Sequence, residues 1–402
     1  FTGITSEAPY SPDSSALAVG RGLILPEGGI MVNNAAGRTN PTAGRRMMKL
    51  RIVADDKIPF LRGALEPFAE VIYLPGGAIA PADVKNADAL ITRTRTRCGE
   101  ALLAGSRVRF IATATIGYDH IDTAYLRRAG IAWRNAPGCN AASVAQYIGS
   151  ALVSSGVELC GKTLGVIGVG NVGSKVAALG EALGMRVLRN DPPRAEREGS
   201  TGFTELPELL AEADFVTIHT PLTRDGAHPT FHLCDAGFPE LMRPGAQLFN
   251  SGRGEVVDTA ALKAALKSGR ISAAVLDVWE NEPGIDRELL DLVRIGTPHI
   301  AGYSTDGKAN GTAMAVQAVA AFFGIPGLAE WRPERLPEPE TPEIELETGA
   351  SVREQVAQAL LHTYDIGLDD GKLRSDPAGF EPQRGHYRIR REYPAFRVRD
   401  GR

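Results

Sequence analysis

The sequence predicts an α/β protein with two doubly wound parallel-sheet domains and a small α+β module at the C-terminus. Short apolar runs alternate with helical patterns from residue 50 onward, which indicates βαβ units and parallel sheets. A glycine-rich turn at residues 168–173 begins a second series of such units. A run rich in proline and glutamate, residues 330–347, then separates a basic stretch from the rest of the chain.

Composition supports an ordinary globular protein. The chain has 402 residues, of which 43% are hydrophobic and 23% charged, enough for two or three cores. Its net charge of -4 indicates neither a nucleic-acid nor a membrane partner. The four cysteines show no metal-ligand spacing, so we expect no metal and a reducing, cytoplasmic location. They are Cys98, Cys139, Cys160 and Cys234.

Residues 1–47 differ from the rest of the chain in composition. Gly, Ser, Asn, Pro and Ala dominate them, and they form a poor signal peptide. A strand-like pattern begins directly after Met48. We therefore interpret residues 1–47 as a disordered or non-native leader and Met48 as the functional start. A true leader with a targeting role is the alternative.

The apolar runs define the order of the predicted strands. Five runs lie in a domain predicted over residues 48–140 and completed by residues 300–325, and six lie in a domain predicted over residues 141–299. In chain order they read RIVA, EVIYL, DALITR, VRFIATA, IAWRNA, TLGVIGVG, RVLRND, FVTIHT, AQLFNS, AAVLDVW and VRIGTPH.

The end of the chain predicts a helix, a linker and a separate module. The apolar segment 311–323 is typical of one long helix. Residues 330–347 hold seven Glu, two Arg and four Pro, so we expect a linker over residues 326–347. Residues 371–402 carry nine Lys or Arg against four Asp or Glu. A solvated basic face explains that charge as well as a partner does.

The glycine-rich turn predicts a dinucleotide site. Gly168, Gly170 and Gly173 follow an apolar strand and open a helical stretch, as a bound pyrophosphate requires. Gly168 would form the turn, Gly170 would let the backbone approach phosphate, and Gly173 would let helix pack on strand. Asp191 ends the next strand, and a carboxylate there accepts hydrogen bonds from ribose hydroxyls and repels a 2′-phosphate. NAD is therefore the expected cofactor.

Three later segments supply candidate catalytic groups. Arg253 lies between two glycines, a context suited to gripping a carboxylate. Asp277 and Glu282 follow one strand, and His299 follows Thr297 and Pro298. Oxidation of a 2-hydroxy acid needs an arginine for the carboxylate, a histidine for the hydroxyl proton and a carboxylate to orient the imidazole. Taken alone, a histidine in such a place is more often a hydrogen-bonded loop residue than a base, and the spacing does not decide between these two roles for His299.

The ordered segments GVGNVG, HTPL, NSGRG, DVWENEP and TPHIAG, together with Asp191, resemble the D-isomer-specific 2-hydroxyacid dehydrogenase family over roughly residues 48–325. This resemblance implies that Arg253, Glu282 and His299 are the catalytic residues, with His299 as proton donor or acceptor. It also implies contacts to NAD and to substrate. The NAD set is Gly168, Gly170, Asn171, Val172, Gly173, Asp191, Thr220, Asn250, Ser251, Gly252, Arg253, Asp277 and Gly302. The substrate set is Arg93, Thr94, Thr115 and Tyr303.

Further segments narrow the resemblance to one branch of that family. APGCNAASVAQY, HIAGYSTDGKANGT and YDIGLDDGKLR resemble members that oxidise 4-phospho-D-erythronate in vitamin B6 biosynthesis and that dimerise through a C-terminal module, here residues 348–402. The resemblance thus implies a small phosphorylated hydroxy acid as substrate and a homodimer. Alternatives are a dehydrogenase of 3-phosphoglycerate, glyoxylate or hydroxypyruvate, and a non-catalytic NAD-sensing binding protein.

Overall fold

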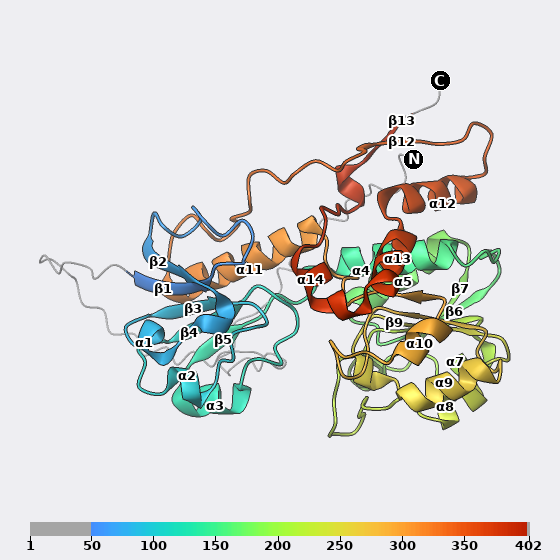
Figure 1. Cartoon of the computed structure of the whole chain (residues 1–402), viewed down its shortest axis with the longest axis horizontal. Helices are drawn as coiled ribbons and strands as arrows, with labels where there is room; N and C mark the ends of the chain where they lie inside the picture. Colours follow the sequence, from blue (N-terminus) through green and yellow to red (C-terminus); the bar gives the residue numbers. More distant parts are fainter. Residues whose placement is uncertain (1–49, 400–402) are drawn as a thin grey trace, which may run out of the picture. The chain divides into compact units, whose positions relative to one another are not determined.

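The computed structural model describes residues 50–399, which form two large parallel sheets and one small sheet (Figure 1). The leader predicted over residues 1–47 and the start at Met48 lie outside the described residues. No helix within residues 50–399 combines the length and apolar character needed to cross a bilayer. All four cysteines are free.

The first sheet has the strand order β2-β1-β3-β4-β5, and all its strands are parallel. Alternate residues of β1 face opposite sides: Ile52 packs in a core with helix α11, whereas Val53 packs in a core with α1, α2 and α3. Both faces are therefore covered, as in a doubly wound fold. The strands are β1 (Leu50–Asp55), β2 (Ala69–Leu74), β3 (Ala89–Thr92), β4 (Phe110–Thr113) and β5 (Ala132–Arg134). The helices are α1 (Pro81–Val84), α2 (Glu100–Leu103), α3 (Thr123–Ala129) and α11 (Thr305–Phe323).

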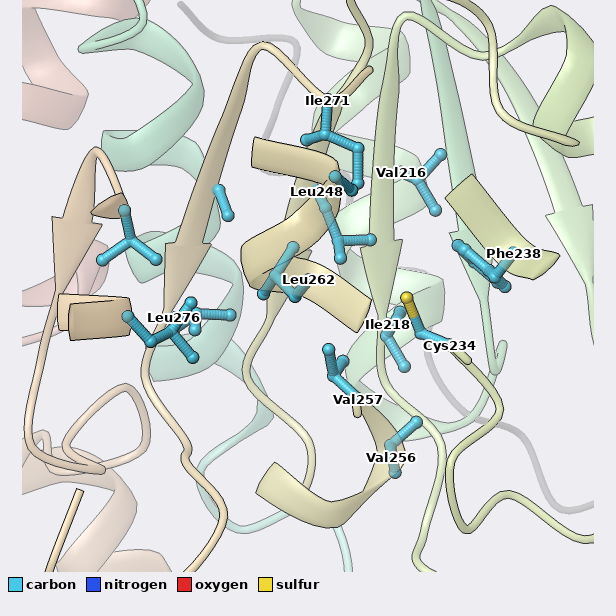
Figure 2. Close-up of a cluster of buried hydrophobic side chains, with 14 of the residues drawn as sticks. Val216, Ile218, Cys234, Phe238, Leu248, Val256, Val257, Leu262, Ile271 and Leu276 are labelled. Atoms are coloured by element: carbon cyan, nitrogen blue, oxygen red, sulfur yellow. The ribbon is translucent and has the colours of Figure 1, made fainter. Parts of the chain in front are cut away.

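The second sheet has the order β11-β10-β9-β8-β6-β7, again all parallel. Helices α4 and α5 cover one face, and α7 to α10 cover the other. Figure 2 shows part of the core between this sheet and helices α7 to α10, where Ile218 and Leu248 of the sheet pack with Phe238 of α8 and Leu262 of α9. The strands are β6 (Thr163–Ile167), β7 (Arg186–Asn190), β8 (Phe215–Ile218), β9 (Gln247–Asn250), β10 (Ala273–Leu276) and β11 (Ile295–Gly296). The helices are α4 (Ala141–Val153), α5 (Asn171–Ala182), α6 (Pro192–Glu198), α7 (Leu206–Glu212), α8 (Gly237–Leu241), α9 (Thr259–Lys267) and α10 (Arg287–Leu292).

Each of the eleven apolar runs contains or overlaps one strand of these two sheets. The predicted α/β class is thereby confirmed. The long helix is also present, but it begins at Thr305 and not at residue 311. Its first turn contains polar residues and therefore lacks the apolar pattern of a buried helix. Ser304 fixes the start of the helix by accepting a hydrogen bond from the Gly307 N–H.

As far as residue 399, the C-terminal module contains two strands, three α-helices and two short 3-10 helices. Strand β12 (Glu343–Glu345) pairs with β13 (Arg397–Arg399), and β12 lies inside the segment predicted as a linker. The helices are α12 (Val352–Thr363), α13 (Ile366–Ser375) and α14 (Phe380–Gly385). Leu360 and Tyr364 join the core of α4 and α5, and Phe380 joins the core of α7 to α10. The module is thus packed onto the second sheet's domain.

Arg390 fastens the module to the loop that follows β11. Its guanidinium is fully buried and donates to the carbonyl oxygens of Ser143, Ile300 and Ala301 and to the side chain of Gln146. The basic C-terminal stretch is therefore not wholly a solvated face. Because the side chain of Arg390 is buried and its donors are bonded to oxygens of the protein, Arg390 has a structural role.

We expect Arg390→Met to lower the free energy of unfolding by about 3 kcal/mol, because several buried oxygens would lose the hydrogen bonds that they accept from a charged group. Urea denaturation monitored by circular dichroism would measure this loss. Arg397→Met, at an exposed position of β13, is the matched control and should change stability by less than about 0.5 kcal/mol. Equal stability of the two variants would refute the role given to Arg390.

Candidate active site

One pocket gathers seven of the residues predicted to form the site. It lies where the carboxyl ends of strands in both large sheets meet the start of α11, the usual place for ligands in open α/β sheets. Its lining combines groups from the first sheet's domain, from the second sheet's domain and from the C-terminal module. The seven residues are Arg93, Thr94, Thr115, Arg253, His299, Gly302 and Tyr303.

His299 and Glu282 form a hydrogen-bonded pair. Nδ1 of His299 lies 2.8 Å from Oε2 of Glu282, while Oε1 of Glu282 accepts from the Trp279 N–H at 2.9 Å. Burial raises the pKa of Glu282, but its bonds to His299 and Trp279 and the charge of Arg384 outweigh burial and hold that pKa below its ordinary value. Glu282 is therefore ionised and fixes the ring. Nε2 of His299 has no hydrogen-bond partner among residues 50–399, so it is the nitrogen open to a ligand.

Asp277 fixes the backbone that carries His299. Its carboxylate accepts from the Thr297 hydroxyl and from the N–H groups of Ile300 and Ala301, at 2.7 to 2.8 Å. His299 has a φ of +56°, a left-handed conformation that is costly for a side chain with a Cβ. Burial raises the pKa of Asp277, against the charge of His299 and these hydrogen bonds. Both oxygens of Asp277 are thus engaged within the protein, and its contact with NAD stays a prediction.

Arg253 is positioned by the turn after β9. Asn250 closes this turn: its Nδ2 donates to the Arg253 carbonyl at 2.9 Å, and its Oδ1 accepts from the Gly252 N–H at 3.0 Å. The Arg253 guanidinium donates to the Gly252 carbonyl and, at 3.4 Å, to the exposed Asp119. Since Asp119 is 79% exposed, this ion pair is weak and the guanidinium can exchange it for a ligand. Ser251 contacts His219.

The glycine-rich turn has the geometry of a pyrophosphate cradle. Gly168 has a φ of +83°, and a Cβ there would meet the backbone of His219 and Thr220 at 2.9 to 3.0 Å. Gly170 precedes the first residue of α5, and a Cβ on it would find no protein atom within 4 Å. A Cβ on Gly173 would lie 2.0 Å from the Gly168 carbonyl oxygen. The turn is therefore tight, open on one side and closely packed on the other.

The groups around this turn fit a dinucleotide. Asp191 lies at the end of β7, where its carboxylate accepts from the Val169 N–H within the turn and from the Arg194 N–H. The hydroxyl of Thr220 is buried and has no hydrogen-bond partner in the described part of the chain. Arg189 and Arg194 also lie here, and each is paired with a glutamate, Glu181 and Glu198 respectively. The helix N-terminus formed by Asn171 and Val172 would face the phosphates.

Two glycine variants separate packing from ligand contact at this turn. We expect Gly173→Ala to lower both NAD affinity and the midpoint of thermal unfolding, because its Cβ clashes with backbone. Gly170→Ala should unfold like the unmodified protein yet bind NAD at least about tenfold more weakly, since its methyl group occupies the space expected for phosphate. Titration calorimetry and thermal denaturation would measure both. Unchanged NAD affinity of Gly170→Ala would contradict the assignment.

The other histidines are held by the fold. Burial lowers the pKa of His120 to about 4 and that of His219 to about 3, so both are neutral near pH 7. His120 contacts Thr92, and His219 lies between Thr217 and Ser251. These contacts give both histidines a structural role.

The structure adds two cations that the sequence did not single out. Lys308 of α11 and Arg384 of α14 line the same pocket as Arg253 and His299. Burial, and after it the charges of Arg93 and Arg390, lower the pKa of Lys308 to about 8. The only sequence signal for Arg384 was the basic C-terminal stretch. Nothing local in that stretch indicates that this one side chain reaches the pocket.

Two family models match the chain. Residues 132–301 match the NAD binding domain of the D-isomer specific 2-hydroxyacid dehydrogenases. Residues 335–401, which include the C-terminal module, match a domain of unknown function.

Curated relatives and solved structures agree with the first match. The chain is 51% identical over 354 residues to an erythronate-4-phosphate dehydrogenase of Bacteroides fragilis, covering 87% of this chain and 99% of that one. It is 43% identical to an erythronate-4-phosphate dehydrogenase of Cronobacter sakazakii, covering 87% and 94%. The crystal structure of a D-lactate dehydrogenase from Aquifex aeolicus complexed with NAD and lactic acid is 30% identical, with a TM-score of 0.56 over 68% of this chain and 95% of that one.

A cradle that fits a pyrophosphate, a histidine–carboxylate pair beside an arginine, and relatives that match over nearly their whole length all lead to the same conclusion. The chain is an NAD-dependent dehydrogenase and belongs to the D-isomer specific 2-hydroxyacid dehydrogenase family, in the group of the erythronate-4-phosphate dehydrogenases.

Proposed function

We propose that this protein oxidises 4-phospho-D-erythronate at C2 to (R)-3-hydroxy-2-oxo-4-phosphooxybutanoate, as a step of pyridoxal 5′-phosphate biosynthesis. One observation carries the proposal: the pocket that contains His299 and Arg253 is also lined by Arg93, Lys308 and Arg384. An acid–base group and a carboxylate-binding arginine thus share one space with enough positive charge for a second anionic group. The names of the relatives supply the particular substrate.

The reaction needs one proton and one hydride to leave the substrate. Nε2 of His299 takes the proton of the C2 hydroxyl as the bond from C2 to hydrogen breaks and the carbonyl forms. Glu282 accepts from Nδ1–H, so the neutral ring has its proton on Nδ1 and its lone pair on Nε2, and the carboxylate stabilises the imidazolium that forms afterwards. The glycine-rich turn and Asp191 would hold NAD, which would supply the acceptor for the hydride that leaves C2.

Arg253 binds the substrate carboxylate and the C2 oxygen. Its planar guanidinium can grip a carboxylate with two parallel hydrogen bonds, which fixes C2 relative to His299. Thr94, Thr115 and Tyr303 line the same pocket and are proposed to contact the substrate. Thr115 already donates to the Gly117 carbonyl, so we assign its oxygen the role of an acceptor.

The direct test is NADH formation with a panel of hydroxy acids, namely 4-phospho-D-erythronate, 3-phospho-D-glycerate, D-glycerate and glycolate. We expect kcat/KM to be highest for 4-phospho-D-erythronate. A higher value for another acid would replace the substrate and keep the family chemistry. NAD binding with no oxidation of any acid would favour the NAD-sensing alternative instead.

We also propose a homodimer through the C-terminal module. Five large apolar side chains of this module are exposed in the single chain, which supports their burial against a second copy of the chain. They are Val352, Leu361, Leu368, Ile389 and Val398. Light scattering coupled to size-exclusion chromatography would test it, and a monomer mass would refute it. The cytoplasmic location inferred from the cysteines stays a prediction.

A further inference from the structure

We propose that Lys308 and Arg384, together with Arg93, bind the phosphate group of the substrate, so that the C-terminal module takes part in substrate recognition. This inference rests on the proposed function and assigns the residues for one group of that substrate. It also gives a role to one residue within the match to a domain of unknown function, residues 335–401.

The three cations come from three separate parts of the fold. Arg93 follows β3 in the first sheet, Lys308 lies in the first turn of α11, and Arg384 lies in α14 of the C-terminal module (Figure 1). All three line the pocket that contains His299, and all three also line an adjoining pocket. Neither His299 nor Arg253 lines the adjoining pocket. The three cations therefore border the side of the site that continues away from the reacting groups.

Lys308 is a half-buried cation without a carboxylate partner among residues 50–399. Its Nζ lies 4.9 Å from the ring centre of Tyr303 and 5.7 Å from that of Tyr387, and no ion pair or hydrogen bond to Nζ occurs in the described residues. The lowered pKa of Lys308 has the same origin, since burial and neighbouring positive charges both disfavour the ammonium. A bound dianion would remove this penalty.

Arg384 is only partly neutralised within the protein. Its Nη1 pairs with Glu381 at 2.6 Å, and Glu381 also binds Arg95 at 2.7 Å. The Nε of Arg384 is buried and has no hydrogen-bond partner in the part of the chain that the structure describes. Arg384 lies over the ring of Tyr303, 5.6 Å from its centre, as Lys308 does at 4.9 Å. Tyr303 is thus contacted by both cations at the pocket wall.

The charge of the pocket matches a substrate with two anionic groups. We call the pocket that contains His299 the inner pocket. It is lined by four cations, Arg93, Arg253, Lys308 and Arg384, and Asp119 is its only carboxylate among the described lining residues. The adjoining pocket adds the cations Lys57 and Arg95 but also the carboxylates of Asp55, Asp56 and Glu381, so the excess of positive charge is larger in the inner pocket. A phosphate monoester carries a charge of about -1.5 to -2 near pH 7. With Arg253 on the carboxylate, the other three cations remain for the phosphate.

The experiment compares 4-phospho-D-erythronate with D-erythronate in Lys308→Met and Arg384→Met variants. The quantity measured is the ratio of kcat/KM for the two substrates, which cancels any loss common to both. We expect each variant to lower this ratio by about 30-fold, the usual size of a lost hydrogen bond between charged groups. Arg353→Gln, an exposed arginine of α12 that lines neither pocket, is the charge-matched control and should keep the ratio.

A second measurement does not depend on turnover. Inorganic phosphate should raise the thermal unfolding midpoint of the unmodified protein more than that of either variant. An unchanged substrate ratio in both folded variants would overturn the phosphate site while leaving the proposed function intact. If the unmodified protein itself shows no preference for the phosphorylated acid, the proposed function fails, and equal phosphate stabilisation of protein and variants would reject the site independently.

Discussion

Replacing His299 with alanine is expected to lower kcat by about 100- to 10,000-fold, because it removes the only acid–base group proposed to take the hydroxyl proton. NAD affinity should change less than about twofold, since the glycine-rich turn lies in a different segment from the imidazole. Stopped-flow measurement of NADH formation, with NAD binding followed by calorimetry, would give both quantities. His228→Ala, which removes a partly exposed histidine paired with Glu196, is the control for the loss of an imidazole as such.

A double variant tests whether Glu282 acts through His299. Alone, Glu282→Gln should lower kcat, because the amide cannot stabilise the imidazolium formed at Nε2. In the His299→Ala background the same change should cost little, since the partner of Glu282 is already absent. Turnover near normal in His299→Ala would remove His299 from the mechanism, and full additivity of the two changes would separate Glu282 from it.

Arg253→Ala is the second variant with a large expected effect. We expect kcat/KM to fall about 100- to 1,000-fold, the range typical for loss of one donor that stabilises a developing charge. Arg253→Lys should recover only part of this loss, because an ammonium keeps the charge but not the planar fork. Steady-state kinetics with saturating NAD would measure both variants.

Added guanidinium ion distinguishes a binding role from a structural one. If the side chain of Arg253 acts only through its head group, guanidinium should restore part of the activity of Arg253→Ala and none of that of His299→Ala. The side chain of Asn250 bonds to the Gly252 N–H and to the Arg253 carbonyl and so holds the turn that carries Arg253; the variant should therefore fold normally. Normal kinetics in Arg253→Ala would exclude the arginine from substrate binding.

Most strands were predictable because they are short, nearly continuous apolar runs buried on both faces. Ile52 and Val53 of β1, for example, are both fully buried but lie in different cores. The start of the long helix was not, because its first turn contains polar residues and is fixed by the Ser304 cap. Strand β12 lies in a segment rich in glutamate and proline, and the one strand that pairs with it within residues 50–399 is β13, which is distant in sequence.

The residues of the candidate site likewise include some that the sequence could indicate and one that it could not. Gly168, Arg253 and His299 belong to short sequence motifs whose residue types indicate a chemical role, so the sequence alone could identify them as candidates. Arg384 becomes part of the pocket only because α14 is packed onto the second sheet's domain through Phe380. That contact joins segments far apart in the chain, and no local pattern in a single sequence encodes it.

The most direct test of the whole account is the fate of the C2 hydrogen. The protein would be incubated with NAD and 4-phospho-D-erythronate carrying deuterium at C2, and the NADH formed would be analysed by mass spectrometry and proton NMR. We expect each NADH to carry one deuterium on the nicotinamide ring and a 2-oxo acid to accumulate in equal amount. NADH without deuterium, or no NADH from this substrate while another hydroxy acid is oxidised readily, would contradict it.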